Sequence, residues 1–307
     1  MKEKGFLGRI QGFYSKPLNQ KILTARFFTR HGLAKIPFLP TRFHLKIYPN
    51  EIASFYWSKI MPNFIPTQGI LGGVFSHWPD TNACELSFLY SFLKEGMIFF
   101  DLGAFHGIYS VVASRKVGMR GKVVAFEPAR KKRVILTANL FLNRIKNVRV
   151  ESCVLTSKTN ELTFYVVGDG NTMFDSLKKP ITKYHLREVK VKGITIDEYC
   201  SQNGIARIDM MKIDIEGGEL EAFCGASKVL NVYRPLIICE VLDIATYSWG
   251  YKAREIIHFL KGIGYEWFAF SADGKIYPHT EFLEYTGADN YLAVPKEKID
   301  LVNHWIK

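Results

Sequence analysis

The chain has 307 residues, of which 48% are hydrophobic and 14% aromatic, so its composition supports a sizeable core and excludes wholesale disorder. Its 41 Lys and Arg residues outnumber 29 Asp and Glu residues, which gives a formal net charge of +12. The five cysteines form no CxxC pair, which argues against a zinc cluster and indicates buried free thiols in a reducing compartment.

The first 83 residues differ from the rest of the chain. Residues 1–60 carry 11 Lys and Arg but only two Asp and Glu, and seven of the 12 prolines precede residue 84. We predict an N-terminal accessory segment, residues 1–83, with short amphipathic helices around residues 6–14 and 22–27. Its basic, aromatic-rich composition is compatible with packing on the main domain and with peripheral contact to an anionic membrane.

Charged residues interrupt every apolar run in the first 30 residues, and no stretch approaches the roughly 18 apolar residues of a membrane span. We therefore expect a cytoplasmic protein that contacts membranes, if at all, only at their surface.

From residue 84 onward, helical and strand patterns alternate. This alternation predicts a Rossmann-like, mainly parallel sheet flanked by helices, with ligands at the carboxyl ends of the strands. Helices are predicted at 84–93, 108–116, 129–143, 219–230 and 253–262, and strands at 97–102, 122–126, 148–155, 210–215, 236–242, 267–270 and 291–294.

Residues 158–197 interrupt this alternation, since predicted strands at 161–167 and 189–196 flank a polar segment. We predict an inserted β-hairpin within a catalytic domain that spans residues 84–307. A surface hairpin and a flap over an acceptor are both compatible with the pattern. In a flap, Asn171, Thr172, Ser176 and His185 could contact hydroxyl groups.

The loop after the first predicted strand carries the features of a cofactor site. Gly103 permits a sharp turn and Gly107 permits close packing at the start of the next helix, while Asp101 precedes both. Glu127 ends the next strand, where a carboxylate can accept hydrogen bonds from both ribose hydroxyls. The G-x-x-x-G spacing differs from the G-x-G-x-x-G of nicotinamide dehydrogenases. His106, in the same loop, is either a structural hydrogen-bonding group or a catalytic base.

An acidic cluster follows two later strands. Asp214 and Glu216 are two residues apart, so on an extended strand they would share a face, and Glu240 ends the neighbouring predicted strand. Three interpretations remain open, namely a divalent-cation site, a general base for an alcohol, or groups that orient a cofactor. Glu219 is expected near the N-terminus of the following helix, where its negative charge is favourable with the helix dipole. Lys212 is expected to pair with a nearby acidic side chain.

These motifs together resemble the FkbM family of class I methyltransferases. The resemblance covers roughly residues 84–294 and depends on the combined order of the motifs. The matching segments are Asp101-Leu102-Gly103-Ala104, Gly107-Ile108-Tyr109-Ser110, Phe126-Glu127-Pro128, Asn139, Thr195-Ile196-Asp197-Glu198, Lys212-Ile213-Asp214-Ile215-Glu216-Gly217 and Glu240.

The resemblance implies a seven-stranded sheet, S-adenosylmethionine as methyl donor, and O-methylation of sugars or other small hydroxylated metabolites. It places Asp214 and Glu216 on the D-x-E-G motif of the family. From the residues themselves, we expect Asp214, Glu216 or Glu240 to act as the base or to hold a metal ion, with His106 as a further catalytic candidate. Phe105-His106 departs from the smaller or more polar pair expected in that loop. The predicted cofactor-binding residues are Asp101, Gly103, Ala104, Gly107, Ser110, Glu127 and Asp214.

Three other functions compete with this one. An NAD-dependent oxidoreductase is disfavoured by the glycine spacing. Methylation of nucleic acid is disfavoured because the Asn/Asp-Pro-Pro-aromatic tetrapeptide is absent. A non-catalytic S-adenosylmethionine-binding protein would not need the acidic cluster, although the sequence is compatible with one.

Overall fold

The computed structural model describes residues 41–47, 51–57, 85–168, 174–182, 184–271, 275–287 and 289–307. All of these belong to one unit that spans residues 41–307. The helices predicted around residues 6–14 and 22–27 lie outside the described residues, as does Cys84. The strands β1 (Thr41–Ile47) and β2 (Glu51–Trp57) form an antiparallel pair that was not predicted among the surrounding prolines.

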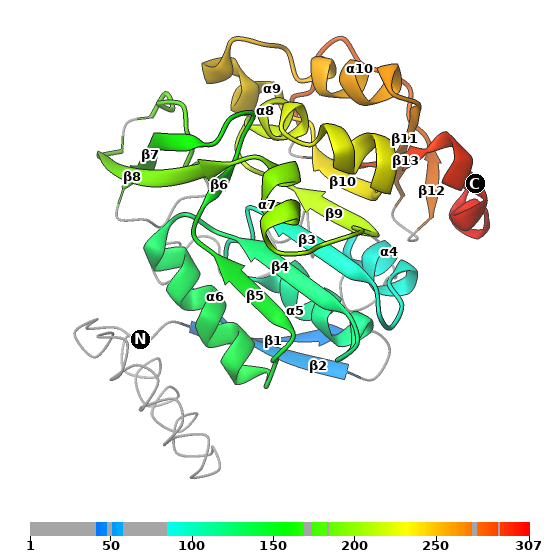
Figure 1. The fold of residues 1–307 in the computed structure, drawn as a ribbon, viewed down its shortest axis with the longest axis horizontal. Coiled ribbons are helices and arrows are strands. Elements are labelled where there is room, and N and C mark those ends of the chain that lie inside the picture. The colour runs from blue at the N-terminus through cyan, green and yellow to red at the C-terminus, as the bar shows by residue number, and fades with distance from the viewer. Residues whose placement is uncertain are drawn as a thin grey trace, which may run out of the picture. The chain divides into compact units, whose positions relative to one another are not determined.

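Eight strands form the main sheet in the order β12-β11-β13-β10-β9-β3-β4-β5 (Figure 1). The neighbours from β10 to β5 are parallel, whereas β13 is antiparallel to β10 and β11. The mainly parallel sheet is therefore confirmed, and β12, only three residues long, joins the seven predicted strands. The strands are β3 (Ile98–Leu102), β4 (Lys122–Phe126), β5 (Val148–Glu151), β9 (Met210–Ile213), β10 (Leu236–Glu240), β11 (Tyr265–Phe270), β12 (Ile276–Pro278) and β13 (Asn290–Pro295).

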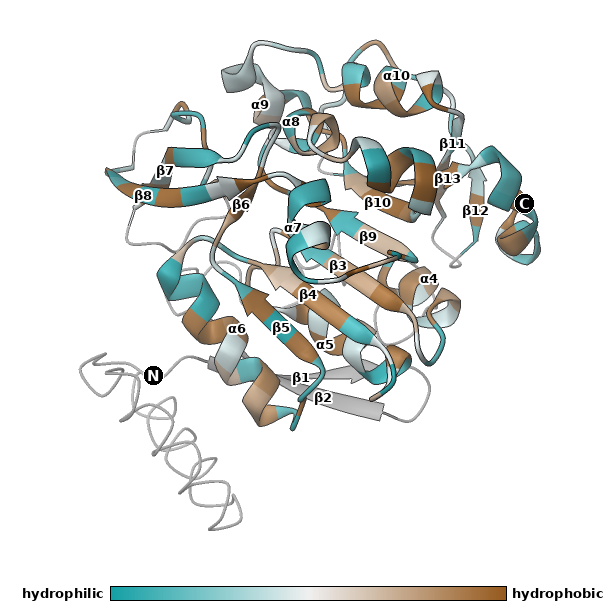
Figure 2. Cartoon of the chain, in the orientation of Figure 1, coloured by the Kyte–Doolittle hydropathy of each residue, from teal (hydrophilic) through white to brown (hydrophobic). Residues whose placement is uncertain are grey.

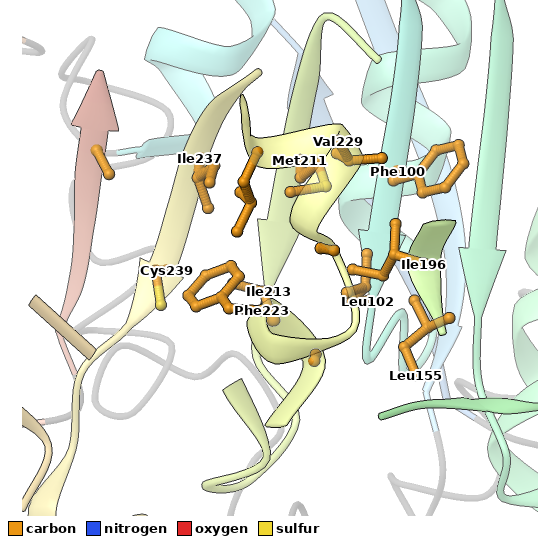
Figure 3. Packing of buried hydrophobic residues seen from close by; sticks show 14 of the residues in the cluster. Phe100, Leu102, Leu155, Ile196, Met211, Ile213, Phe223, Val229, Ile237 and Cys239 are labelled. Carbon is orange, nitrogen blue, oxygen red and sulfur yellow. The ribbon is translucent and has the colours of Figure 1, made fainter. Parts of the chain in front are cut away.

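Side chains of the central strands point alternately to the two faces of the sheet, and a layer of helices covers each face. Phe100 of β3, Met211 of β9 and Ile237 of β10 point to one layer and share a hydrophobic cluster with Phe223 of α8 (Figure 3). The intervening residues face the opposite layer, which places Asp101 of β3 beside α5. The first layer contains α7 (Ile196–Gln202), α8 (Glu219–Cys224) and α10 (Arg254–Gly262), and the second contains α4 (Glu85–Phe92), α5 (Ile108–Val117) and α6 (Arg130–Leu142).

A separate three-stranded sheet contains the inserted hairpin. Strands β7 (Asn160–Val167) and β8 (Leu186–Ile194) are antiparallel, and β6 (Val154–Leu155) is parallel to β8. Hydropathy alternates along β8, whereas β10 is hydrophobic along most of its length (Figure 2). The single strand predicted at 148–155 is wrong, because β5 ends in the main sheet and β6 pairs with β8. A continuous strand pattern cannot reveal such a change of partner.

Several predicted boundaries also shift. The strand predicted at 189–196 ends at Ile194, because Thr195 accepts a hydrogen bond from the Glu198 backbone N–H and caps α7. The helix predicted at 219–230 is the short α8 followed by a π-helical turn at Val229–Tyr233. Within the described residues, no helix is long and apolar enough to cross a membrane.

Candidate active site

A cavity of about 590 Å³ lies at the carboxyl ends of the central strands. Its wall includes Gly103 after β3, Glu127 after β4, Asp214 after β9 and Glu240 at the end of β10. Strand β4, which follows β3 in the sequence, lies on one side of β3 in the sheet. Strand β9, which comes later in the sequence, lies on the other side of β3. This is the switch point at which open parallel sheets bind ligands.

The β3–α5 loop is fixed by close backbone packing. Gly103 has a φ of 80°, and a Cβ atom there would lie 1.8 Å from the Asp214 carbonyl oxygen. The N–H groups of Gly103 and Ala104 donate to the Phe126 carbonyl at 3.1 and 3.0 Å. Gly103 and Ala104 line the cavity, whereas a Cβ atom on Gly107 would meet Leu136 at 2.2 Å. Gly107 therefore serves helix packing in this structure, and its cofactor contact stays a prediction.

Asp101 and Ser110 form a buried pair behind this loop. The Ser110 hydroxyl donates to Asp101 Oδ2 at 2.6 Å, and Asp101 Oδ1 is buried without a hydrogen-bond partner among the described residues. Burial raises the pKa of Asp101 to about 6, although Lys212 and Ser110 oppose this rise. The pair supports the loop from beneath, and Asp101 still has an oxygen that can accept a hydrogen bond.

Glu127 is oriented by two backbone groups. Its Oε2 accepts from the Phe105 N–H at 2.9 Å and its Oε1 from the Ala129 N–H at 2.8 Å. Burial raises its pKa to about 7, against the opposing charge of Lys132. Because an ionised carboxylate has about four acceptor sites, both oxygens can still receive ligand hydroxyls.

Asp214 is paired with Lys212, as predicted for that lysine. The Lys212 Nζ lies 2.7 Å from Asp214 Oδ2 and 4.7 Å from the centroid of the Tyr109 ring. Burial opposes the charged form of Lys212, but the carboxylates of Asp214 and Asp101 outweigh it and raise the pKa of the lysine. Lys212 thus supplies a buried positive charge beside the cavity.

Glu216 does not share a strand face with Asp214, so that prediction is wrong. Strand β9 ends at Ile213, and Glu216 has a left-handed backbone with a φ of 58°. Its carbonyl oxygen accepts from Trp249 Nε1 and Ser176 Oγ, each at 3.0 Å, and these bonds hold the turn.

The three predicted carboxylates nevertheless line the same cavity. Burial, and then the charge of Asp214, raises the pKa values of Glu216 and Glu240 well above the ordinary range. Glu219 lies elsewhere, since it begins α8 and accepts from the Ile215 N–H at 2.8 Å. Among the residues that the structure describes, no group of three or more His, Cys, Asp or Glu side chains is placed to hold a metal ion. The divalent-cation interpretation therefore gains no support.

His106 lines the cavity as a buried, neutral imidazole. Burial, with the nearby charge of Lys132, holds its pKa well below the ordinary value. Its ring stacks on Phe105 with centroids 3.8 Å apart, and its carbonyl oxygen accepts from Asn139 Nδ2 at 2.7 Å.

One buried ion pair in the cavity wall was missed from the sequence. Lys132 Nζ on α6 lies 2.9 Å from Asp175 Oδ2 in the inserted segment, and the two side chains are only 5% and 2% exposed. Asp175 also accepts from the Val167 N–H at 2.8 Å. No sequence signal marked the pair, because Lys132 lies in a basic run that is typical of a solvated helix face.

The inserted segment contributes to the cavity, although not through the residues that were singled out. Phe174, Asp175 and Leu177 line it. Ser176 instead holds the Glu216 turn, and His185 is exposed. Asn171 and Thr172 lie outside the described residues.

Several known methyltransferases are similar to this chain. The model of the methyltransferase FkbM domain matches residues 101–267. Methyltransferase sdnD of Sordaria araneosa is 30% identical over an alignment of 155 residues, with 42% of this chain and 60% of that relative covered. The chain therefore spans less than two thirds of that relative's length.

Solved structures with low sequence identity are also similar. The methyltransferase FkbM of Methylobacillus flagellatus KT is 15% identical over 66% of this chain and 44% of that chain, with a TM-score of 0.41. A SAM-dependent O-methyltransferase of Thermotoga maritima is 12% identical over 86% of this chain and 96% of that chain, with a TM-score of 0.40. The match of the domain model to more than half of the sequence shows that the chain belongs to the methyltransferase FkbM domain family.

Proposed function

We propose that this protein transfers the methyl group of S-adenosylmethionine to a hydroxyl group of a sugar, a glycan or another small hydroxylated metabolite. The observation that carries the proposal is one cavity whose wall holds differently satisfied carboxyl groups. One end, after β3 and β4, carries the Gly103 loop and Glu127, whose two oxygens accept backbone N–H groups. The other end, at β10, carries Glu240, which keeps one buried oxygen without a hydrogen-bond partner among the described residues. Glu216 lines the same cavity, and its pKa is raised by burial and then by the charge of Asp214.

The residues at the first end fit the cofactor. Glu127 faces the cavity with acceptor capacity for two ribose hydroxyls, and its orientation is already fixed by two backbone N–H groups. Asp101 retains one buried acceptor oxygen beneath the loop, which suits an ammonium group or an ordered water. S-adenosylmethionine supplies, when bound, a methyl group activated by a sulfonium.

The residues at the second end handle the acceptor and its proton. An acceptor hydroxyl that takes the methyl group must give up its proton to a base. Glu240 and Glu216 suit this task because a raised pKa favours proton uptake. Asp214 suits it less well, since Lys212 already neutralises its charge at 2.7 Å. The walls align the two reactants and limit the access of water.

Isotope transfer tests this proposal. The full-length protein is incubated with S-adenosylmethionine that carries a labelled methyl group and with a panel of sugars and simple alcohols. We expect S-adenosylhomocysteine and an alkali-stable methyl ether of the acceptor. Label on a nitrogen would reassign the acceptor. Reduction of NAD in a parallel reaction with the same acceptors, without methyl transfer in the first, would favour the oxidoreductase alternative. Cofactor binding without turnover on any acceptor would favour a non-catalytic binding protein.

A further inference from the structure

Two buried oxygen atoms on neighbouring strands lack hydrogen-bond partners among the residues that the structure describes. Glu240 ends β10, Asn290 begins β13, and the two residues are register partners across the strand pair. Glu240 Oε2 and Asn290 Oδ1 are each buried with no hydrogen-bond partner among the described residues, and both residues line the cavity. Because an unsatisfied buried acceptor is costly, these atoms mark a place where a ligand can supply donors.

The orientation of the Asn290 amide is fixed from behind. Its Nδ2 donates to Glu85 Oε1 at 3.2 Å, and the Tyr109 hydroxyl donates to the same oxygen at 2.7 Å. An ionised carboxylate can only accept, so the NH₂ end of the amide must face Glu85. The Oδ1 end is therefore the one that remains for a ligand.

The cofactor placed by the proposed function leaves this place free. Glu127 follows β4, and β3 and β9 separate β4 from β10. Strands β4 and β10 are therefore three strand spacings, or about 14 Å, apart, and β13 lies one spacing beyond β10. A cofactor whose ribose is held by Glu127 occupies the space above β3 and β9, so β10 and β13 face the acceptor.

We infer that Glu240 and Asn290 form a two-oxygen subsite for a vicinal diol. Glu240 accepts the proton of the hydroxyl that is methylated, and Asn290 accepts a hydrogen bond from the hydroxyl on the adjacent carbon. Directly paired strand residues have Cα atoms about 4.5–5.5 Å apart, which allows both side chains to reach one small group. The inference rests on the proposed function, and it assigns to Asn290 an acceptor-binding role that its sequence context did not indicate.

Binding of two matched probes tests this subsite. The complex of the full-length protein with S-adenosylhomocysteine is titrated with cis-1,2-cyclohexanediol and with cyclohexanol by ligand-observed NMR. We expect the diol to bind about tenfold more tightly, which corresponds to one hydrogen bond to a buried acceptor. Asn290→Leu, which removes the amide at similar volume, should reduce this preference to within about twofold and leave the affinity for S-adenosylhomocysteine unchanged.

Glu85→Gln is the matched control, because it keeps an oxygen that accepts from Tyr109 and Asn290, and it should preserve the preference. Equal binding of the two probes to the unmodified protein, or no binding of either, overturns the diol subsite. So does an Asn290→Leu variant that keeps the preference. If Asn290→Leu does not fold, the relative affinity of the unmodified protein for the diol and for cyclohexanol decides whether the diol subsite exists. Failure to bind S-adenosylhomocysteine would instead count against the proposed function.

Discussion

Glu127 and Glu240, which lie at the two ends of the cavity, differ in how their oxygen atoms are satisfied. Glu127 accepts a backbone N–H at each oxygen, so its position is set before any ligand arrives. Glu240 keeps a buried oxygen without a partner among the described residues, and its pKa is raised. The difference indicates that the fold itself fixes the position of Glu127, whereas Glu240 keeps an oxygen that a bound hydroxyl group or an ordered water can satisfy.

The largest expected effect comes from removing the carboxylate of Glu240, the proposed base. Glu240→Gln keeps the size of the side chain but cannot take up a proton, so we expect kcat to fall by roughly 10²- to 10⁴-fold. The affinity for S-adenosylmethionine should stay within about twofold, because Glu240 lies beyond the cofactor end. Steady-state kinetics and calorimetry measure the two quantities. If Glu240→Gln is fully active and Glu216→Gln is not, the base is Glu216.

Breaking the ion pair in the cavity wall should chiefly affect stability. Lys132→Met leaves the buried Asp175 carboxylate without its cation, which we expect to lower the free energy of unfolding by about 3–5 kcal/mol. The double variant Lys132→Met/Asp175→Leu is the control, since it removes both charges and should recover much of the loss. Urea denaturation measures all three proteins. A single variant as stable as the unmodified protein would contradict the burial of this pair.

The raised pKa values at the cofactor end predict a pH effect on the ligand-free protein. Glu127 has a folded-state pKa of about 7 against an ordinary value of 4.5, so the folded state holds its proton more tightly than the unfolded state. Its contribution to stability is present below pH 4.5 and is lost as the pH rises toward 7, by at most about 1.4 kcal/mol per pH unit.

Thermal denaturation between pH 4.5 and 7 checks this sign. Glu127→Gln cannot ionise, so its melting temperature should fall less steeply with pH than that of the unmodified protein. Parallel curves for the two proteins would show that Glu127 does not titrate in this window.

The smallest expected effect concerns the basic N-terminal residues and the binding of the protein to anionic membranes. Residues 1–60 hold 11 of the 41 Lys and Arg residues, and basic residues near an anionic bilayer contribute about 1 kcal/mol each at best. We expect the full-length protein to sediment with vesicles that contain phosphatidylserine at low salt, and to be released at high salt. Sedimentation that is equal with neutral vesicles would contradict an electrostatic contact.

The sequence predicted most of the main sheet because hydrophobic runs and glycine turns are local signals. Strand β4 begins and ends where predicted, and the predicted cavity residues Gly103, Glu127, Asp214 and Glu240 converge. The left-handed backbone of Glu216 depends on Trp249 and Ser176, which are distant in sequence. The role of Lys132 likewise depends on a distant partner in the insertion. Such features arise from tertiary contacts, which no local pattern records.

The Gly103 loop and Glu127 are proposed to bind S-adenosylmethionine. Calorimetric titration of the full-length protein with S-adenosylmethionine and with NAD tests it most directly. We expect saturable binding of S-adenosylmethionine only, weakened about 10- to 100-fold in Glu127→Ala because hydrogen bonds from the ribose to a charged group are lost. Tighter binding of NAD, or an affinity for S-adenosylmethionine that Glu127→Ala leaves unchanged, would contradict the claim.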